Sequence, residues 1–208
     1  MRRGVALFIL LLIIGFAYAC KEGVKEQTRT EPGPSLDGKR VVMIIASRDF
    51  RDEELQEPRS LLEQRGAQVT IACSKLGEVT GMKGIKITPD ILIDQINVED
   101  YDAVIFVGGS GAKEYWDDPK AHSIAKDTVA AGKVLGAICI APVTLANAGL
   151  LDGKKATVFS SEKDRLEASG AIYTGASVEV DGKIITGNGP KAAEEFGEAI
   201  AHALGARL

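Results

Sequence analysis

The sequence predicts one α/β domain built on a mostly parallel β-sheet with helices on both faces. Short, mainly apolar runs of strand length recur along the chain, and segments with helical spacing of leucine and alanine lie between them. Glycine follows several of these helical segments, as is common at helix ends. Strands that are apolar throughout are typical of parallel sheets covered on both sides, and their alternation with helices favours this class. Ligands of such a sheet bind beyond the carboxyl ends of its strands.

The expected strands share a mainly apolar composition. They are Val41–Ala46, Val69–Cys73, Ala103–Val107, Val134–Ile138 and Ala156–Phe159. Two hairpins are also expected. The first covers Gly77–Thr88, where residue types alternate around two glycines. The second joins Ser177–Val180 to Lys183–Thr186 through Asp181-Gly182, a dipeptide that suits a tight turn.

The expected helices begin or end at residues that favour those places. They are Glu53–Arg65, Pro119–Ala131, Ile140–Ala148, Glu162–Ala168 and a last helix from Pro190 to about Leu204. Gly66, Gly132 and Gly149 follow the first three of these helices. Pro119 stands in the first turn of the second helix, where its missing N–H leaves no helical hydrogen bond unmade.

Residues 1–19 have the composition of a signal peptide. Arg2 and Arg3 form a basic start, Val5–Phe16 is an apolar stretch, and Ala17-Tyr18-Ala19 places small residues where a signal peptidase cleaves. The apolar stretch is shorter than the roughly 20 residues of a membrane-spanning helix. A retained N-terminal anchor is the alternative. The prediction is a cleaved signal, and therefore export to the periplasm or cell envelope.

Cys20 follows the expected cleavage site directly and resembles the lipid-attachment cysteine of bacterial lipoproteins. Residues 20–38 are polar, contain Pro32 and Pro34 and have no apolar periodicity, so they indicate a flexible tether. We expect a diacylglycerol on Cys20 that anchors the protein to a membrane. Ordinary cleavage that leaves a free Cys20 is the alternative. The folded domain is expected to cover residues 39–208.

The composition is that of a globular protein and argues against several partners. The chain is 45% hydrophobic and 26% charged, with a formal net charge of −4. No basic stripe is visible, so nucleic acid is not an expected partner. No cluster of His, Cys and carboxylates has metal-ligand spacing, and no cofactor is expected. Apart from Cys20, Cys73 and Cys139 could pair or stay free, because sequence does not set the distance between them.

Ala137-Ile138-Cys139-Ile140-Ala141 has the pattern of a nucleophile elbow. Such an elbow holds its nucleophile on a sharp strand-to-helix turn, and small residues are needed two positions away on each side. A helix that begins at Ile140 would direct its N-terminal dipole at the sulfur and favour thiolate. A buried structural cysteine is the alternative, and the five residues alone do not decide between the two.

Two further segments could serve the same site. Glu54 is expected in the first turn of a helix that follows a neighbouring strand, where a carboxyl group could tune the ionisation of Cys139. An acidic first turn is also ordinary helix capping. Gly108-Gly109-Ser110-Gly111 follows another strand, and an N–H there could serve an oxyanion hole. A dinucleotide-binding motif would need a third glycine where Glu114 stands.

These segments, in this order and spacing, resemble the DJ-1/PfpI family over about Lys39 to Leu204. The residues that carry the resemblance are Phe50–Pro58, Val104–Ala112, Gly136–Pro142, Ile185–Pro190 and Glu195-Phe196. The resemblance implies a flavodoxin-like, usually dimeric protein with a nucleophile elbow. It assigns Cys139 as the reactive cysteine, Glu54 as its protonated partner, and the N–H groups of Gly109 and Ile140 as oxyanion donors. It also implies a cysteine that ionises easily and oxidises to sulfinate.

The chain departs from the hydrolytic members of this family at the position after the cysteine, where Ile140 replaces histidine. The loop that supplies a histidine in other members corresponds to Phe159–Glu162, which has none. His122 and His202 are expected on the surfaces of helices. Without a histidine to protonate a leaving amine, peptide cleavage is poorly supported.

Two principal hypotheses about function follow. The first is an exported thiol protein that uses Cys139 on small electrophiles such as methylglyoxal, with glyoxalase-, deglycase- or hydrolase-like chemistry. The second is a non-enzymatic redox sensor or protective protein that acts through oxidation of Cys139. An inactive family member that binds a ligand or partner is a third.

Overall fold

The computed structural model describes residues 33–205. The signal peptide expected at 1–19, Cys20 and residues 21–32 of the expected tether lie outside the described residues, as do residues 206–208. Within 33–205, no helix is long and apolar enough to cross a membrane.

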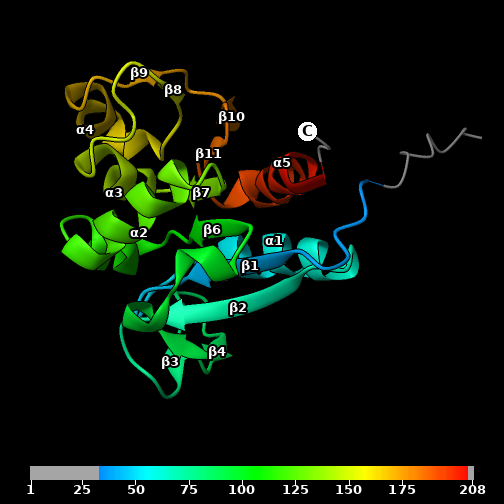
Figure 1. Cartoon of the computed structure of the whole chain (residues 1–208). Coiled ribbons are helices and arrows are strands. Elements are labelled where there is room, and N and C mark those ends of the chain that lie inside the picture. The colour runs from blue at the N-terminus through cyan, green and yellow to red at the C-terminus, as the bar shows by residue number, and fades with distance from the viewer. Residues whose placement is uncertain (1–32, 206–208) are drawn as a thin grey trace, which may run out of the picture. The chain divides into compact units, whose positions relative to one another are not determined.

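A seven-stranded sheet forms the centre of the domain (Figure 1). In spatial order its strands are β10 (Val178–Asp181), β11 (Ile184–Gly187), β7 (Val134–Ile138), β6 (Ala103–Phe106), β1 (Arg40–Ile44), β2 (Gln68–Cys73) and β5 (Ile91–Leu92). All neighbours pair in parallel except β10 and β11. The flavodoxin-like fold class predicted from the sequence is therefore confirmed.

The helices pack against this sheet in two groups. The longer helices are α1 (Asp52–Gln64), α2 (Pro119–Ala130) and α5 (Ala193–Gly205), and the shorter ones are α3 (Pro142–Asn147) and α4 (Lys163–Ala168). Helix α1 packs on α5, while α2 packs on α3 (Figure 1). The crossover β1-α1-β2 runs in one direction along the sheet and β6-α2-β7 runs in the other. Because such crossovers are right-handed, α1 and α2 cover opposite faces.

The strand order reverses between β1 and β6, which creates the crevice where ligands of open α/β sheets bind. Both strands are buried along most of their length, and residues 41–46 are fully buried. Segments that leave these two strands, and β7 beside them, therefore meet at one edge of the sheet. This meeting point brings the site residues together.

Smaller elements surround the sheet. β3 (Val79–Thr80) and β4 (Lys86–Ile87) form the hairpin expected at Gly77–Thr88. β8 (Lys155–Ala156) and β9 (Ile172–Tyr173) form a separate two-stranded sheet. Short 3-10 helices are η1 (Ile93–Gln95), η2 (Val98–Asp100), η3 (Ser110–Tyr115), η4 (Ser160–Glu162) and η5 (Pro190–Ala192). The last of these forms the first turn of the helix expected from Pro190, and α5 continues from Ala193.

Two expected elements differ from the structure. The helix expected from Ile140 begins at Pro142, because residues 139–141 form the turn itself. The strand expected at Ala156–Phe159 ends at Ala156. Beyond it, the N–H of Thr157 donates to Oγ1 of Thr186 (2.9 Å) and that of Phe159 donates to the carbonyl of Cys139 (2.8 Å). These long-range hydrogen bonds replace a strand ladder and fix the segment beside the elbow.

Candidate active site

Cys139 lies directly after β7 in a left-handed conformation, with φ of 64°. A non-glycine residue rarely adopts this conformation, and its strain is tolerated where the surroundings hold it. The N–H of Cys139 donates to the carbonyl of Gly187 (2.8 Å), and that of Ala141 donates to the carbonyl of Ile138 (3.1 Å). The Cys139 residue is 8% exposed. The geometry is that of the tight strand-to-helix turn which the small residues around Cys139 predict.

Glu54 lies in the first turn of α1, and its side chain points to the cysteine. The residue is fully buried, and neither carboxyl oxygen has a hydrogen-bond partner of regular geometry among the described residues. The groups beside the carboxyl are the Cys139 thiol and the N–H of Gly108. Burial raises the pKa of Glu54 from 4.5 to about 8, so this carboxyl carries a proton at neutral pH. The structure thus brings Glu54 and Cys139 together, as the sequence reasoning expects.

Cys139 and Glu54 form a coupled pair. Burial, and then the negative charge of ionised Glu54, raise the pKa of the Cys139 thiol to about 12, while the N–H groups of Gly109 and Ile140 oppose this rise. A second negative charge beside the first is unfavourable, so the pair loses its two protons in widely separated steps. After the first step one charge and one proton remain. The two N–H groups at sulfur favour the thiolate, whereas the N–H of Gly108 favours the carboxylate.

The source of the anion-stabilising groups differs from the expectation. Helix α3 is only six residues long and starts at Pro142, so the dipole of a helix from Ile140 is not available. The N–H of Ile140 belongs to the turn and still faces the sulfur, as does the N–H of Gly109. The two amides that the family resemblance assigns to Cys139 therefore lie beside it, whereas the expected start of the helix at Ile140 was wrong.

The role of Gly108 was missed by the sequence reasoning. A Cβ at this position would overlap Cβ of Cys139 and Oε2 of Glu54, so only glycine leaves room for the pair. Gly109 has φ of 99°, and a Cβ there would overlap the backbone of residues 49–51. The repeated glycines after β6 could have suggested close packing, but not which side chains would use the space.

A cavity of about 400 Å³ opens beside the thiol. Its walls come from the start of α1, the β3–β4 hairpin, η3, the elbow, η4 and the start of η5. The lining residues are Arg51, Glu54, Met82, Gly109, Ser110, Lys113, Cys139, Ile140, Phe159, Ser161, Glu162 and Pro190. The cavity places the thiol within reach of a small molecule.

Asp52 holds part of this wall in place, and sequence reasoning did not identify it. Its buried carboxylate accepts hydrogen bonds from the N–H groups of Lys83 (2.8 Å) and Ile85 (2.9 Å) in the hairpin turn. This turn carries Met82, whose N–H donates to the carbonyl of Phe50 (2.9 Å) and whose sulfur accepts from the N–H of Ser110 (3.4 Å). Asp52 thereby joins the first turn of α1 to the hairpin at the cavity.

The two histidines lie away from the cavity lining. Nε2 of His122 lies 2.8 Å from the carbonyl oxygen of Trp116, and the His202 side chain is exposed on α5. His122 is therefore less exposed than expected. Within residues 33–205, no group of three or more His, Cys, Asp or Glu side chains is arranged to hold a metal ion. Cys73 is buried and free, and so is Cys139.

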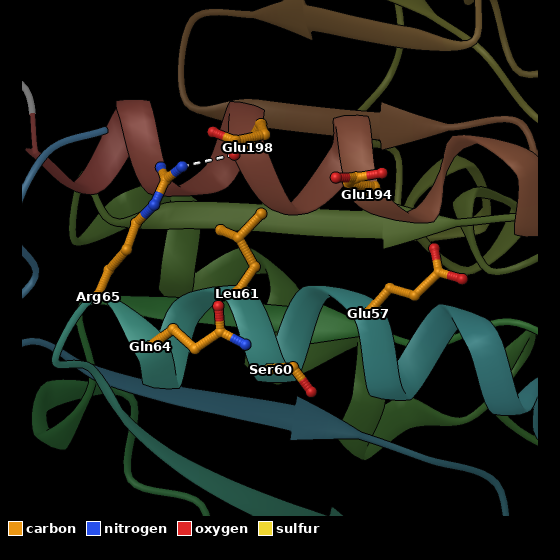
Figure 2. A pocket seen from close by; sticks show the side chains of 7 residues that line it. All are labelled: Glu57, Ser60, Leu61, Gln64, Arg65, Glu194 and Glu198. Atoms are coloured by element: carbon orange, nitrogen blue, oxygen red, sulfur yellow. Dashed lines mark hydrogen bonds and ion pairs between the residues drawn. The ribbon is translucent and has the colours of Figure 1, made fainter. Parts of the chain in front are cut away.

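A second groove, of about 340 Å³, lies between α1 and α5. Figure 2 shows its lining side chains, with Arg65 and Glu198 joined across the two helices, and Glu57 and Glu194 farther along. Burial, and then the charge of Glu194, raise the pKa of Glu57. No cysteine lines this groove, so the thiol chemistry is expected in the cavity beside Cys139.

Comparison with known proteins shows similar chains in all domains of life. The Uncharacterized protein MJ0967 of Methanocaldococcus jannaschii is 42% identical over 177 residues, which cover 84% of this chain and 86% of that protein. Deglycase PH1704 of Pyrococcus horikoshii is 33% identical over 149 residues, covering 72% and 90%. Glutathione-independent glyoxalase DJR-1.2 of Caenorhabditis elegans is 28% identical over 166 residues, covering 80% and 89%.

The fold agrees with these similarities. The crystal structure of the ThiJ/PfpI domain protein from Brachyspira murdochii superposes with a TM-score of 0.78 at 27% identity, covering 83% of this chain and 98% of that one. The model of the DJ-1/PfpI family matches residues 39–203, nearly the whole described domain. The chain belongs to the DJ-1/PfpI family.

Proposed function

We propose that this protein uses Cys139 as a nucleophile on small carbonyl electrophiles, with 2-oxoaldehydes such as methylglyoxal as the substrate class. The observation that carries the proposal is the buried Cys139–Glu54 pair at the wall of a cavity, with two backbone N–H groups at the sulfur. Similarity to proteins named deglycase and glutathione-independent glyoxalase supports it.

The first step is addition of the Cys139 thiolate to the aldehyde carbon. A C–S bond forms and the carbonyl oxygen takes the negative charge, next to the N–H groups of Gly109 and Ile140. Protonated Glu54 stabilises the attacking thiolate by donating a hydrogen bond to it. In a glyoxalase-type reaction the hydrogen of C1 then moves to C2 as a proton, and water hydrolyses the resulting thioester to a 2-hydroxy acid. Oxidation of C1 balances reduction of C2, so the reaction needs no redox cofactor.

Replacing Cys139 by serine tests this proposal. Turnover of methylglyoxal should fall by about a thousandfold or more, because an alcohol at this position is hardly ionised. Product formation is followed by chromatography of lactate, with Cys73→Ser as the matched control, since Cys73 is buried on β2. Equal turnover by wild type and Cys139→Ser would overturn the proposal.

A second function, oxidative sensing or protection, is favoured by the same geometry. The Gly109 and Ile140 N–H groups and the Glu54 proton could donate to the oxygens of a Cys139 sulfinate. Peroxide treatment that forms stable sulfinate at Cys139, in a protein without dicarbonyl turnover, would favour this function over the first.

We also propose that the protein is exported, lipid-anchored through Cys20 and homodimeric. The basic, apolar and small-residue pattern of residues 1–19 supports export, and family membership supports the dimer. Expressed in a bacterium, the full chain should incorporate labelled fatty acid and fractionate with membranes, whereas Cys20→Ala should not be labelled. Wild-type protein without label would contradict lipidation.

Light scattering of detergent-solubilised protein measures the subunit number, and a monomer mass would contradict the dimer.

A further inference from the structure

The walls of the Cys139 cavity carry charges of both signs, and most of them are neutralised by neighbours. Arg51 pairs with Glu53 through Nε and Oε2 (2.9 Å) and through Nη2 and Oε1 (3.2 Å). Glu162 pairs with Arg165, whose Nε lies 3.1 Å from Oε2. Glu54 is protonated at neutral pH because burial raises its pKa to about 8.

Lys113 is the exception. It lines the cavity but forms no ion pair among the described residues, and the neighbouring Glu114 instead accepts from the N–H of Ser47 (2.8 Å). One positive charge at the cavity wall is thus left without a partner. A lysine without an ion-pair partner at the cavity wall favours an anionic group on the ligand.

Lys113 is an exposed residue of η3 whose side chain lies over an aromatic ring. It is one turn after Ser110 in η3, and because a 3-10 helix has three residues per turn, both side chains lie on the same face. Both line the cavity. Nζ of Lys113 lies 5.2 Å from the ring centre of Trp116, within the range of a cation–π contact.

Trp116 connects this cation to the elbow. Its ring is buried, and its Nε1–H donates to the carbonyl of Ile140 (3.0 Å), the residue after the nucleophile. Arg165 also lies over this ring, at 5.1 Å, while it pairs with Glu162. The Trp116 ring, over which Lys113 lies, is therefore hydrogen-bonded to the turn that contains Cys139.

We propose that the cavity selects electrophiles that carry a carboxylate, and that Lys113 is the specificity-determining residue that binds it. This inference rests on the proposed role of Cys139 as nucleophile. A carboxylate fits better than a phosphate, because a single lysine offers one charge and phosphate sites usually combine several donors. The apolar lining from Met82, Ile140, Phe159 and Pro190 suits a short methylene chain between the carbonyl and the carboxylate.

Alkylation of Cys139 tests the selection without any need for turnover. Iodoacetate and iodoacetamide have nearly the same shape, but only the first is an anion, and in both cases Sγ displaces iodide. The ratio of their rate constants cancels any change in the thiolate fraction. In Lys113→Met this ratio should fall by about fivefold, the size of one partly screened charge interaction. Lys113→Arg should keep the ratio, and the effect should shrink in high salt.

A matched control exists elsewhere in the protein. Lys163 also lies over an aromatic ring, 5.6 Å from that of Tyr173, but does not line the cavity. Lys163→Met should leave the ratio unchanged. Rates are measured on the full chain by mass spectrometry of the peptide that contains Cys139. An equal ratio in wild type and Lys113→Met would overturn the inference.

Turnover gives the second measurement. For 4,5-dioxopentanoate, a carboxylated 2-oxoaldehyde, kcat/KM should fall about fivefold or more in Lys113→Met, while kcat/KM for methylglyoxal changes less than about twofold. A lower alkylation ratio without turnover of either dicarbonyl would refute the proposed function and leave the carboxylate site standing. Turnover with an unchanged ratio and unchanged preference would refute the carboxylate site and leave the function standing.

Discussion

The stability of the wild-type protein is expected to fall as pH rises from 4.5 to 8, and replacing Glu54 by glutamine is expected to remove most of this fall. Burial raises the pKa of Glu54 from 4.5 to about 8 in the folded protein. Between these pH values the unfolded chain releases a proton that the folded protein keeps, so stability falls as pH rises. At roughly 1.4 kcal/mol per pKa unit, and with the carboxyl half titrated at each of these pKa values, the loss between pH 4.5 and 8 amounts to about 4 kcal/mol.

Urea denaturation of wild type and Glu54→Gln at pH 5 and pH 8 measures this effect. Glutamine has nearly the same shape and no proton to release, so the variant should gain about 3.5 kcal/mol of stability relative to wild type between pH 5 and pH 8. Glu63→Gln, on the exposed side of α1 and paired with Arg59, is the control and should follow wild type. A difference between wild type and Glu54→Gln that is the same at both pH values would show that Glu54 is not a buried acid.

The same variant also decides which atom of the pair carries the first negative charge. If protonated Glu54 donates to a Cys139 thiolate, glutamine is a weaker donor, and the midpoint of Cys139 alkylation against pH should rise by about one to two units. If Glu54 ionises first, its charge suppresses the thiolate, and glutamine should lower the midpoint. The pKa values of about 8 for Glu54 and about 12 for Cys139 that burial produces would place the first charge on Glu54. We nevertheless expect the rise, because two N–H groups face the sulfur and one faces the carboxyl.

Substitution of alanine for Gly108 is expected both to destabilise the fold and to disrupt the Cys139–Glu54 pair. The added Cβ would overlap Cys139 and Oε2 of Glu54, and it would lie 2.6 Å from the carbonyl oxygen of Ile138. Cys139 has a strained backbone conformation, and the Glu54 side chain is fully buried, so neither residue has free space to move into. Overpacking of this kind costs about 1–3 kcal/mol or more. Thermal or urea denaturation measures the cost, and the alkylation rate of Cys139 should change strongly as well.

Gly136→Ala provides the matched control for this prediction. Gly136 is also buried, in β7, but its Cβ would meet Cζ of Phe196 (3.0 Å) and Cδ1 of Ile200 (3.1 Å), away from the thiol. It should lower stability while leaving the alkylation midpoint of Cys139 unchanged. If Gly108→Ala behaved in the same way as Gly136→Ala, the close fit of Gly108 against the pair would have no effect on reactivity.

Much of the fold could be predicted from local pattern. The apolar runs at 41–46, 103–107 and 134–138 are buried at the centre of the sheet, because a strand covered on both faces excludes polar side chains. The pair Asp181-Gly182 closes the hairpin of β10 and β11. Prediction failed at Ala156–Phe159, where apolar composition suggested a strand but hydrogen bonds to Thr186 and Cys139 hold the chain in another conformation.

The sequence by itself determined the fold class and, through family resemblance, the elbow around Cys139 and its pairing with Glu54. These depend on short-range patterns of residue size and polarity, which the chain carries locally. Only the tertiary structure decided the roles of Gly108, Asp52, Trp116 and Lys113. Their roles depend on contacts between segments that leave β1, β6 and β7, and such segments meet because the strand order reverses between β1 and β6. The positions of these segments in space decide whether a lysine pairs with a carboxylate or lines a cavity without an ion-pair partner. No local pattern of residues encodes those positions.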